Sequence, residues 1–130
     1  MTPRMLREFL QCHSTLQGIL LWLAGQWPTA DLEITCIHRT PEEEAAAAGK
    51  SGIHVAGPPY RAIDVRVSNL VGNPQASADF WGDFVNAKYV YDPGRPELSV
   101  AVTAPHGTGP HIHLQVHDHT GFRSDPSNHV

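Results

Sequence analysis

The sequence predicts an α+β fold, in which a small antiparallel sheet is flanked by helices. The 130 residues suit one domain whose core needs no disulfide staples. Apolar residues recur at helical spacing near the N-terminus and again near residue 80. Short alternating runs lie between and after these segments, with two or three strands following one another toward the C-terminus.

The first element is a helix over about residues 3–25. Thr2 precedes Pro3, which is the usual order of an N-cap and the first helical residue. His13 lies on or beside the apolar stripe of this helix, with no paired motif around it, and we interpret it as structural. The stripe itself consists of Leu6, Phe9, Leu10, Leu16, Leu20 and Leu23.

A strand over residues 32–37 comes next, because these residues alternate and are partly β-branched. Residues 40–49 then carry every signal of a short helix, from the capping Thr40 to the terminating Gly49. Three glutamates occupy its first turn, and we assign them to the positive end of the helix rather than to a metal.

The middle of the chain predicts a strand over residues 62–67 and a helix over residues 77–85. The strand alternates, so that its apolar residues share one face and Asp64 lies on the other. We assign the aromatic residues of the helix to the core rather than to a sugar-stacking surface; these are Phe80, Trp81 and Phe84.

A turn at residues 92–96 predicts a hairpin between residues 89–91 and 98–102. A Gly/Pro loop over residues 104–110 leads to the last strand, residues 111–116. Residues 118–130 are polar, and we interpret them, with the neighbouring pair of histidines at 117 and 119 and the histidine at 129, as a solvated tail. One domain, residues 1–130, therefore contains the helix over 3–25, a core over about 32–117 and the tail.

Alternation places His111 and His113 on one face of the last strand, opposite Ile112 and Leu114. If this strand is a neighbour of the strand that carries Asp64, the polar faces of the two converge. His54, in the preceding loop, adds a further imidazole. Imidazole nitrogens and a carboxylate are the ligands of catalytic zinc, which keeps one position for water. The sequence therefore predicts a Zn²⁺ site and favours a hydrolase.

Composition argues against other classes of function. The net charge is −4 and the nine Lys and Arg residues are scattered, which argues against nucleic-acid binding. The most apolar run, residues 19–24, is too short to insert in a membrane, and with no secretory signal we expect synthesis in the cytoplasm. Cys12 and Cys36 lack a Cys-x-x-Cys partner and are interpreted as free buried thiols, with a disulfide as the alternative.

At these residues the sequence resembles a superfamily of zinc peptidases. It comprises D-Ala-D-Ala carboxypeptidases, lysostaphin-type endopeptidases, penicillin-insensitive murein endopeptidases and the Hedgehog domain. The family pattern is a His…Asp segment followed by a strand with His or His-x-His. Here residues 61–65 and 111–113 resemble its two parts, and residues 37–40 resemble the segment with a substrate-facing arginine. The single small domain looks most like a bacteriophage endolysin or virion-associated murein hydrolase.

The resemblance implies His54, Asp64 and His113 as metal ligands. It implies His111 as the catalytic base or acid, because Pro110 stands where the carboxypeptidases have a glutamate. Nine residues separate His54 from Asp64, where the family usually has six or fewer.

The resemblance also implies substrate contacts. Arg39 would stabilise the oxyanion or hold a substrate carboxylate. His106 would add a polar contact or only shape its loop, and Tyr60 is a further candidate. The implied substrate is a bacterial peptidoglycan peptide, and a monomer is expected. The enzyme would act in the periplasm or cell wall, after holin-type release or as part of a virion.

Two other functions fit the same residues. A non-catalytic protein of the same fold would use zinc to hold a binding surface or a virion part. A non-haem iron oxygenase also uses two histidines and one carboxylate, but that class usually needs a larger barrel.

Overall fold

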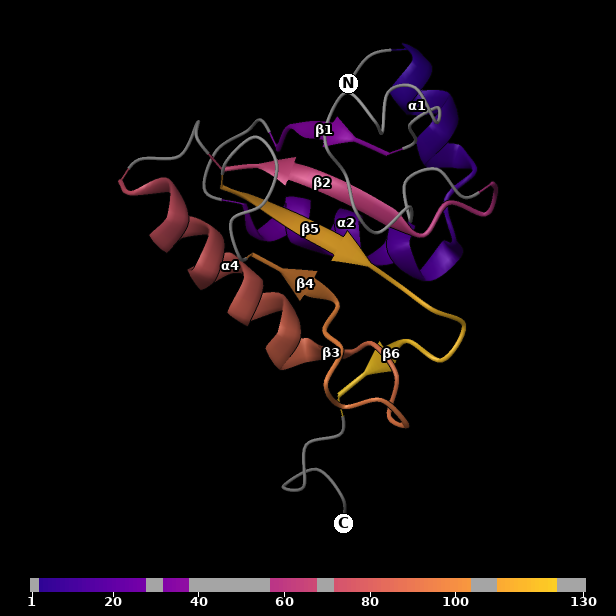
Figure 1. Cartoon of the computed structure of the whole chain (residues 1–130). Helices are drawn as coiled ribbons and strands as arrows, with labels where there is room; N and C mark the ends of the chain where they lie inside the picture. Colours follow the sequence, from indigo (N-terminus) through magenta and orange to yellow (C-terminus); the bar gives the residue numbers. More distant parts are fainter. Residues whose placement is uncertain (1–2, 28–31, 38–56, 68–71, 104–109, 124–130) are drawn as a thin grey trace.

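A four-stranded antiparallel sheet forms the centre of the computed structural model (Figure 1). The structure describes residues 3–27, 32–37, 57–67, 72–103 and 110–123. The strand order is β1–β2–β5–β4, and β3 pairs with β6 in a separate two-stranded sheet. The strands are β1 (Ile34–Cys36), β2 (Ala62–Arg66), β3 (Tyr89–Val90), β4 (Ala101–Val102), β5 (His111–Gln115) and β6 (Gly121–Phe122). The α+β class predicted from the sequence is confirmed.

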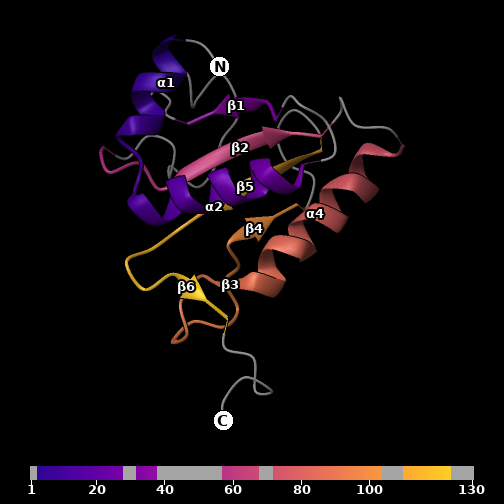
Figure 2. The ribbon, with the colours of Figure 1, turned by 180° about the vertical axis from the view of Figure 1, so that it is seen from behind.

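Three helices accompany the sheet in the described residues: α1 (Pro3–Leu10), α2 (Ser14–Gln26) and α4 (Pro74–Lys88). Figure 2 shows α2 lying across one face of the four-stranded sheet, with α4 along the side of β4. The opposite face of the sheet is not covered by any of these helices (Figure 1). Within the described part of the chain, no helix has the length and apolar character needed to cross a membrane.

The hydrophobic core lies between α2 and the sheet. Side chains with no more than 1% exposure come from both, and they include Leu16, Ile19, Leu23, Ile63, Val65, Ile112 and Leu114. The core therefore uses the alternate positions of β2 and β5 that the sequence assigns to the apolar face. It leaves the other positions of both strands to the opposite face.

The single N-terminal helix predicted over residues 3–25 is wrong, because the chain breaks between α1 and α2. Tyr60 N–H donates to Gln11 O at 3.1 Å, and His13 N–H donates to Tyr60 O at 2.8 Å. These backbone groups therefore pair with a distant segment instead of continuing a helix. His13 then begins α2, since its Nδ1 accepts from Thr15 N at 3.2 Å. The structural role predicted for His13 is confirmed.

Helix α4 is longer than the predicted helix over residues 77–85. Asn73 caps it by accepting from Ala76 N at 3.0 Å, and Pro74 follows at the first position. The prediction that Phe80 and Phe84 belong to the core is wrong, because they are 62% and 39% exposed. The buried face of α4 consists instead of Ala78, Gly82 and Val85, and Trp81 is partly buried against the core.

Gly82 allows α4 to approach the segment that follows β4. A Cβ at this position would lie 2.5 Å from Thr103 Cγ2, and the Thr103 rotamer is held by its hydroxyl, which donates to Asp79 at 2.9 Å. The overlap of an alanine Cβ with Thr103 costs about 1–3 kcal/mol, whereas the higher helix propensity of alanine contributes about 1 kcal/mol. We therefore expect Gly82→Ala to lower the free energy of unfolding.

Urea unfolding measures this effect, and Thr103→Ser supplies the control. Serine keeps the hydroxyl but removes the methyl group, so Gly82→Ala in the Thr103→Ser background should stabilise the protein by about 1 kcal/mol. A stabilising effect of Gly82→Ala in the original background would contradict the close approach.

The predicted hairpin between residues 89–91 and 98–102 is also wrong. β3 pairs with β6, and β4 pairs with β5. The outer edge of β4 is occupied by a side chain, because Asn86 Nδ2 donates to Ala101 O and Ala101 N donates to Asn86 Oδ1, both at 2.9 Å. An amide of α4 thus takes the place of the strand expected there.

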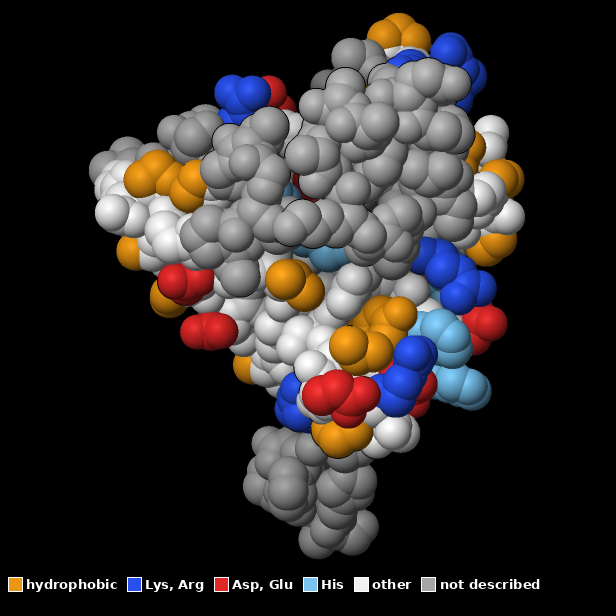
Figure 3. Space-filling model, in the orientation of Figure 1, with side chains coloured by type: hydrophobic (Ala, Val, Ile, Leu, Met, Phe, Trp, Pro, Cys, Tyr) orange, Lys and Arg blue, Asp and Glu red, His pale blue; other side chains and the backbone are white. Residues whose placement is uncertain are grey.

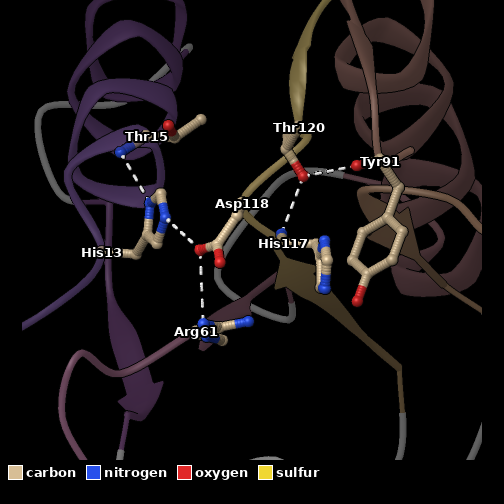
Figure 4. A network of polar contacts seen from close by, with 7 residues as sticks. All are labelled: His13, Thr15, Arg61, Tyr91, His117, Asp118 and Thr120. Carbon is tan, nitrogen blue, oxygen red and sulfur yellow. Dashed lines mark hydrogen bonds and ion pairs between the residues drawn. The ribbon is translucent and has the colours of Figure 1, made fainter. Parts of the chain in front are cut away.

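Residues 118–123 belong to the fold and do not begin a solvated tail. Figure 4 shows the carboxylate of Asp118 between the side chains of His13 and Arg61, at 3.2 Å and 3.3 Å respectively. Arg61 and the hydrogen bond from His13 lower the pKa of Asp118. Thr120 fixes the same turn, since its hydroxyl accepts from His117 N and donates to Tyr91 O. Residues 124–130 lie outside the described residues.

Both cysteines are free thiols, as predicted, although only Cys12 is buried. Burial, and next the charge of Glu8, raise the pKa of Cys12 from 9.0 to about 12. At pH 8 the thiolate fraction is then on the order of 10⁻⁴. Because the thiolate is the reactive form, we expect iodoacetamide to label Cys36 of the folded protein well before Cys12. Mass spectrometry of the labelled peptides checks this order, and preferential labelling of Cys12 would contradict it.

Candidate metal site on the sheet face opposite α2

β2 and β5 are adjacent antiparallel strands, and their register brings the predicted site residues together. Asp64 lies directly opposite His113, and Arg66 lies opposite His111. Ile63 pairs with Leu114 on the core side. The prediction that the two polar faces converge is therefore confirmed, since all these polar residues alternate with buried apolar ones.

Asp64 and His113 form a close buried pair. His113 Nδ1 and Asp64 Oδ1 are 2.9 Å apart, and the two side chains are only 9% and 6% exposed. His111 lies on the same face, with its Nε2 3.8 Å from the same carboxylate oxygen. A buried carboxylate is costly unless polar or charged groups surround it, and two imidazole side chains lie beside this one.

The pair occupies the middle of the sheet. β1 brings Cys36 opposite Asp64, and β4 brings Val102 opposite His113, so strands flank the pair on both sides. In the space-filling view of Figure 3, histidine atoms are visible near the centre of the face that α2 does not cover. A central position on paired strands holds the two side chains more firmly than a loop would.

The second side of His113 contacts Gln115, two residues along the same face. His113 Nε2 and Gln115 Oε1 are 3.2 Å apart, and Gln115 Nε2 donates to Ser99 O at 2.9 Å. Gln115 is not part of the predicted site. The signal was present, because residues 111, 113 and 115 share one face of a strand.

The donor atoms of Asp64 and His113 fit a shared metal ion. A zinc ligand set combines imidazole nitrogen with carboxylate oxygen at about 2.0–2.2 Å from the metal. Two tetrahedral ligands at that distance are roughly 3.3 Å apart, so the observed 2.9 Å would open by a few tenths of an ångström. Among the described residues, no group of three or more His, Cys, Asp or Glu side chains forms a metal site. The described pair therefore supplies two donors.

Of the predicted site residues not yet placed, only Tyr60 is among the described residues. His54, Arg39 and His106 lie outside the described residues, as does the predicted helix over 40–49. Tyr60 is described, and its side chain packs against the hydrophobic core while its backbone joins Gln11 and His13. The substrate contact predicted for Tyr60 stays a prediction.

Comparisons with known proteins identified no relative of this chain. No family model matches the chain, and searches of curated proteins and of solved structures also found no match. The resemblance to zinc peptidases therefore rests on the sequence motifs alone, and the function inferred from it is a proposal.

Proposed function

We propose that this protein is a zinc-dependent peptidase that hydrolyses an amide bond in the stem peptide or cross-link of bacterial peptidoglycan. The observation that carries the proposal is the cross-strand pair in which His113 Nδ1 and Asp64 Oδ1 lie 2.9 Å apart, with His111 beside it. The choice of peptidoglycan as substrate rests on the resemblance of the two motifs to the murein peptidases.

Asp64 and His113 would hold the metal, with His54 as the third ligand. Bound zinc supplies a Lewis acid, which activates water and polarises the carbonyl group of the scissile amide. The protein supplies a rigid support, because both described ligands stand on paired central strands above a buried apolar layer.

His111 would move the proton during hydrolysis. It lies two residues before His113 on the same face, is 15% exposed and borders the pair. Its imidazole would accept a proton from the attacking water and deliver it to the amine nitrogen as the C–N bond breaks. The products are then a free carboxylate and a free amine, which balances the hydrolysis.

The remaining predicted residues complete the proposed site. Arg39 would stabilise the oxyanion or hold a substrate carboxylate through its planar guanidinium group. His106 and Tyr60 would contact the peptide. As a small murein hydrolase, the protein would act on the cell wall as a phage lysis enzyme or as part of a virion.

The test is digestion of isolated Gram-negative sacculi by the zinc-loaded full chain, followed by mass spectrometry of the muropeptides. The proposal predicts new amino and carboxyl ends at one type of peptide bond, and loss of these products when a chelator removes the metal. A folded, zinc-loaded protein that binds sacculi and releases no products would instead support a non-catalytic binding module. Activity with iron alone would support an iron enzyme.

A further inference from the structure

The side-chain amide of Gln115 is held at both ends, which fixes its orientation. Its Nε2 donates to Ser99 O at 2.9 Å, and its Oε1 lies 3.2 Å from His113 Nε2. A backbone carbonyl can only accept a hydrogen bond, so the amino end of the amide must face Ser99. The amide oxygen must therefore face the imidazole of His113.

This orientation decides where His113 carries its hydrogen. The amide oxygen also only accepts, so the hydrogen must be on Nε2 of His113. A neutral imidazole has one N–H group, which leaves the lone pair on Nδ1. That lone pair faces Asp64 Oδ1 at 2.9 Å in a buried position. In that state either a proton or a metal ion can join Nδ1 to the carboxylate oxygen.

We propose that Gln115 is a positioning residue, which holds His113 in the Nε2–H tautomer. His113 Nδ1 and Asp64 Oδ1 can then bind a divalent metal ion together. This inference rests on the proposed metal site and adds the residue that selects the ligating nitrogen. A proton between the two atoms is the competing occupant, and zinc titration distinguishes it from a metal. Hydrogen bonds to the second nitrogen of a metal-bound histidine orient the ring and raise its affinity for the metal.

Zinc affinity tests the role of Gln115. Gln115→Leu removes the acceptor at nearly the same size, and we expect it to weaken zinc binding by about 10–100-fold. Gln17→Leu is the matched control, because Gln17 Nε2 also donates to a backbone carbonyl, Cys12 O at 3.0 Å, but on α2. The control should keep the affinity of the unchanged protein. Competition with a chromophoric chelator measures all three proteins.

The nitrogen that binds the metal provides a second readout, independent of enzymatic activity. In ¹⁵N NMR spectra of the zinc-loaded protein, His113 should show a metal-bound Nδ1 and a slowly exchanging Nε2–H. Gln115→Leu should speed that exchange, and Gln115→Glu, which keeps an acceptor oxygen, should restore part of the zinc affinity.

The outcomes separate this inference from the proposed function. Coordination through Nε2, or equal zinc affinity in Gln115→Leu and the unchanged protein, overturns the role of Gln115 alone. A folded protein that binds no zinc overturns both the metal site at Asp64 and His113 and the proposed peptidase activity. Zinc bound through His113 Nδ1 in a protein without hydrolytic activity would support the metal site and the role of Gln115. It would contradict only the proposed peptidase activity.

Discussion

Asp64→Asn should remove zinc from the protein. The substitution keeps the size of the side chain but replaces a charged carboxylate ligand with a neutral amide. Changes in the groups that only support a ligand cost about 10–100-fold in affinity, so losing the ligand charge should cost at least about 100-fold. Metal analysis after dialysis against a weak chelator checks the result, and hydrolysis of sacculi should fall with the zinc content.

Asp118→Asn is the control for this experiment. Asp118 is also an aspartate hydrogen-bonded to a histidine, with His13 Nε2 3.2 Å away, but it lies in the turn before β6. It should keep one zinc per chain. Retention of zinc by Asp64→Asn, or its loss in Asp118→Asn, would contradict the assignment of the metal to the β2–β5 pair.

His111→Ala should abolish most hydrolysis while zinc stays bound at about one per chain. A positioned acid or base contributes about 10²–10⁴-fold to the rate, and the substitution leaves both donors of the Asp64–His113 pair in place. Quantitative mass spectrometry of muropeptides measures the rate, and metal analysis measures the zinc.

His119→Ala is the matched control for His111, because His119 is an exposed histidine in the turn before β6. It should hydrolyse sacculi at the rate of the unchanged protein. Loss of zinc from His111→Ala would make His111 a ligand, and full activity in that variant would rule it out as the proton carrier.

The convergence of Asp64 and His113 could be predicted from local pattern because strand alternation determines which side chains share a face. Ile63 and Val65 on β2, with Ile112 and Leu114 on β5, identify the buried side of both strands. Asp64 and His113 must then lie on the opposite side. The register between β2 and β5 could not be predicted in this way, because it depends on pairing between segments about fifty residues apart.

Longer-range backbone contacts explain the errors of the prediction. The stripe over residues 3–25 has helical period, yet Tyr60 takes the backbone groups of Gln11 and His13 and divides the helix. Phe80 and Phe84 are apolar enough for the core, but the small Ala78 and Gly82 form the closer contact of α4. In both cases a local pattern competes with contacts between distant segments, and those contacts form only in the folded chain.

Zinc K-edge X-ray absorption of the loaded protein tests the metal site most directly. The proposed ligands His54, Asp64 and His113 predict a shell of only nitrogen and oxygen at about 2.0–2.2 Å, with the outer scattering of imidazole rings. Cys36 lies opposite Asp64 across β1 and β2, so a thiolate is the nearest competing ligand in the register. A sulfur shell at about 2.3 Å, or the absence of imidazole scattering, would contradict the account.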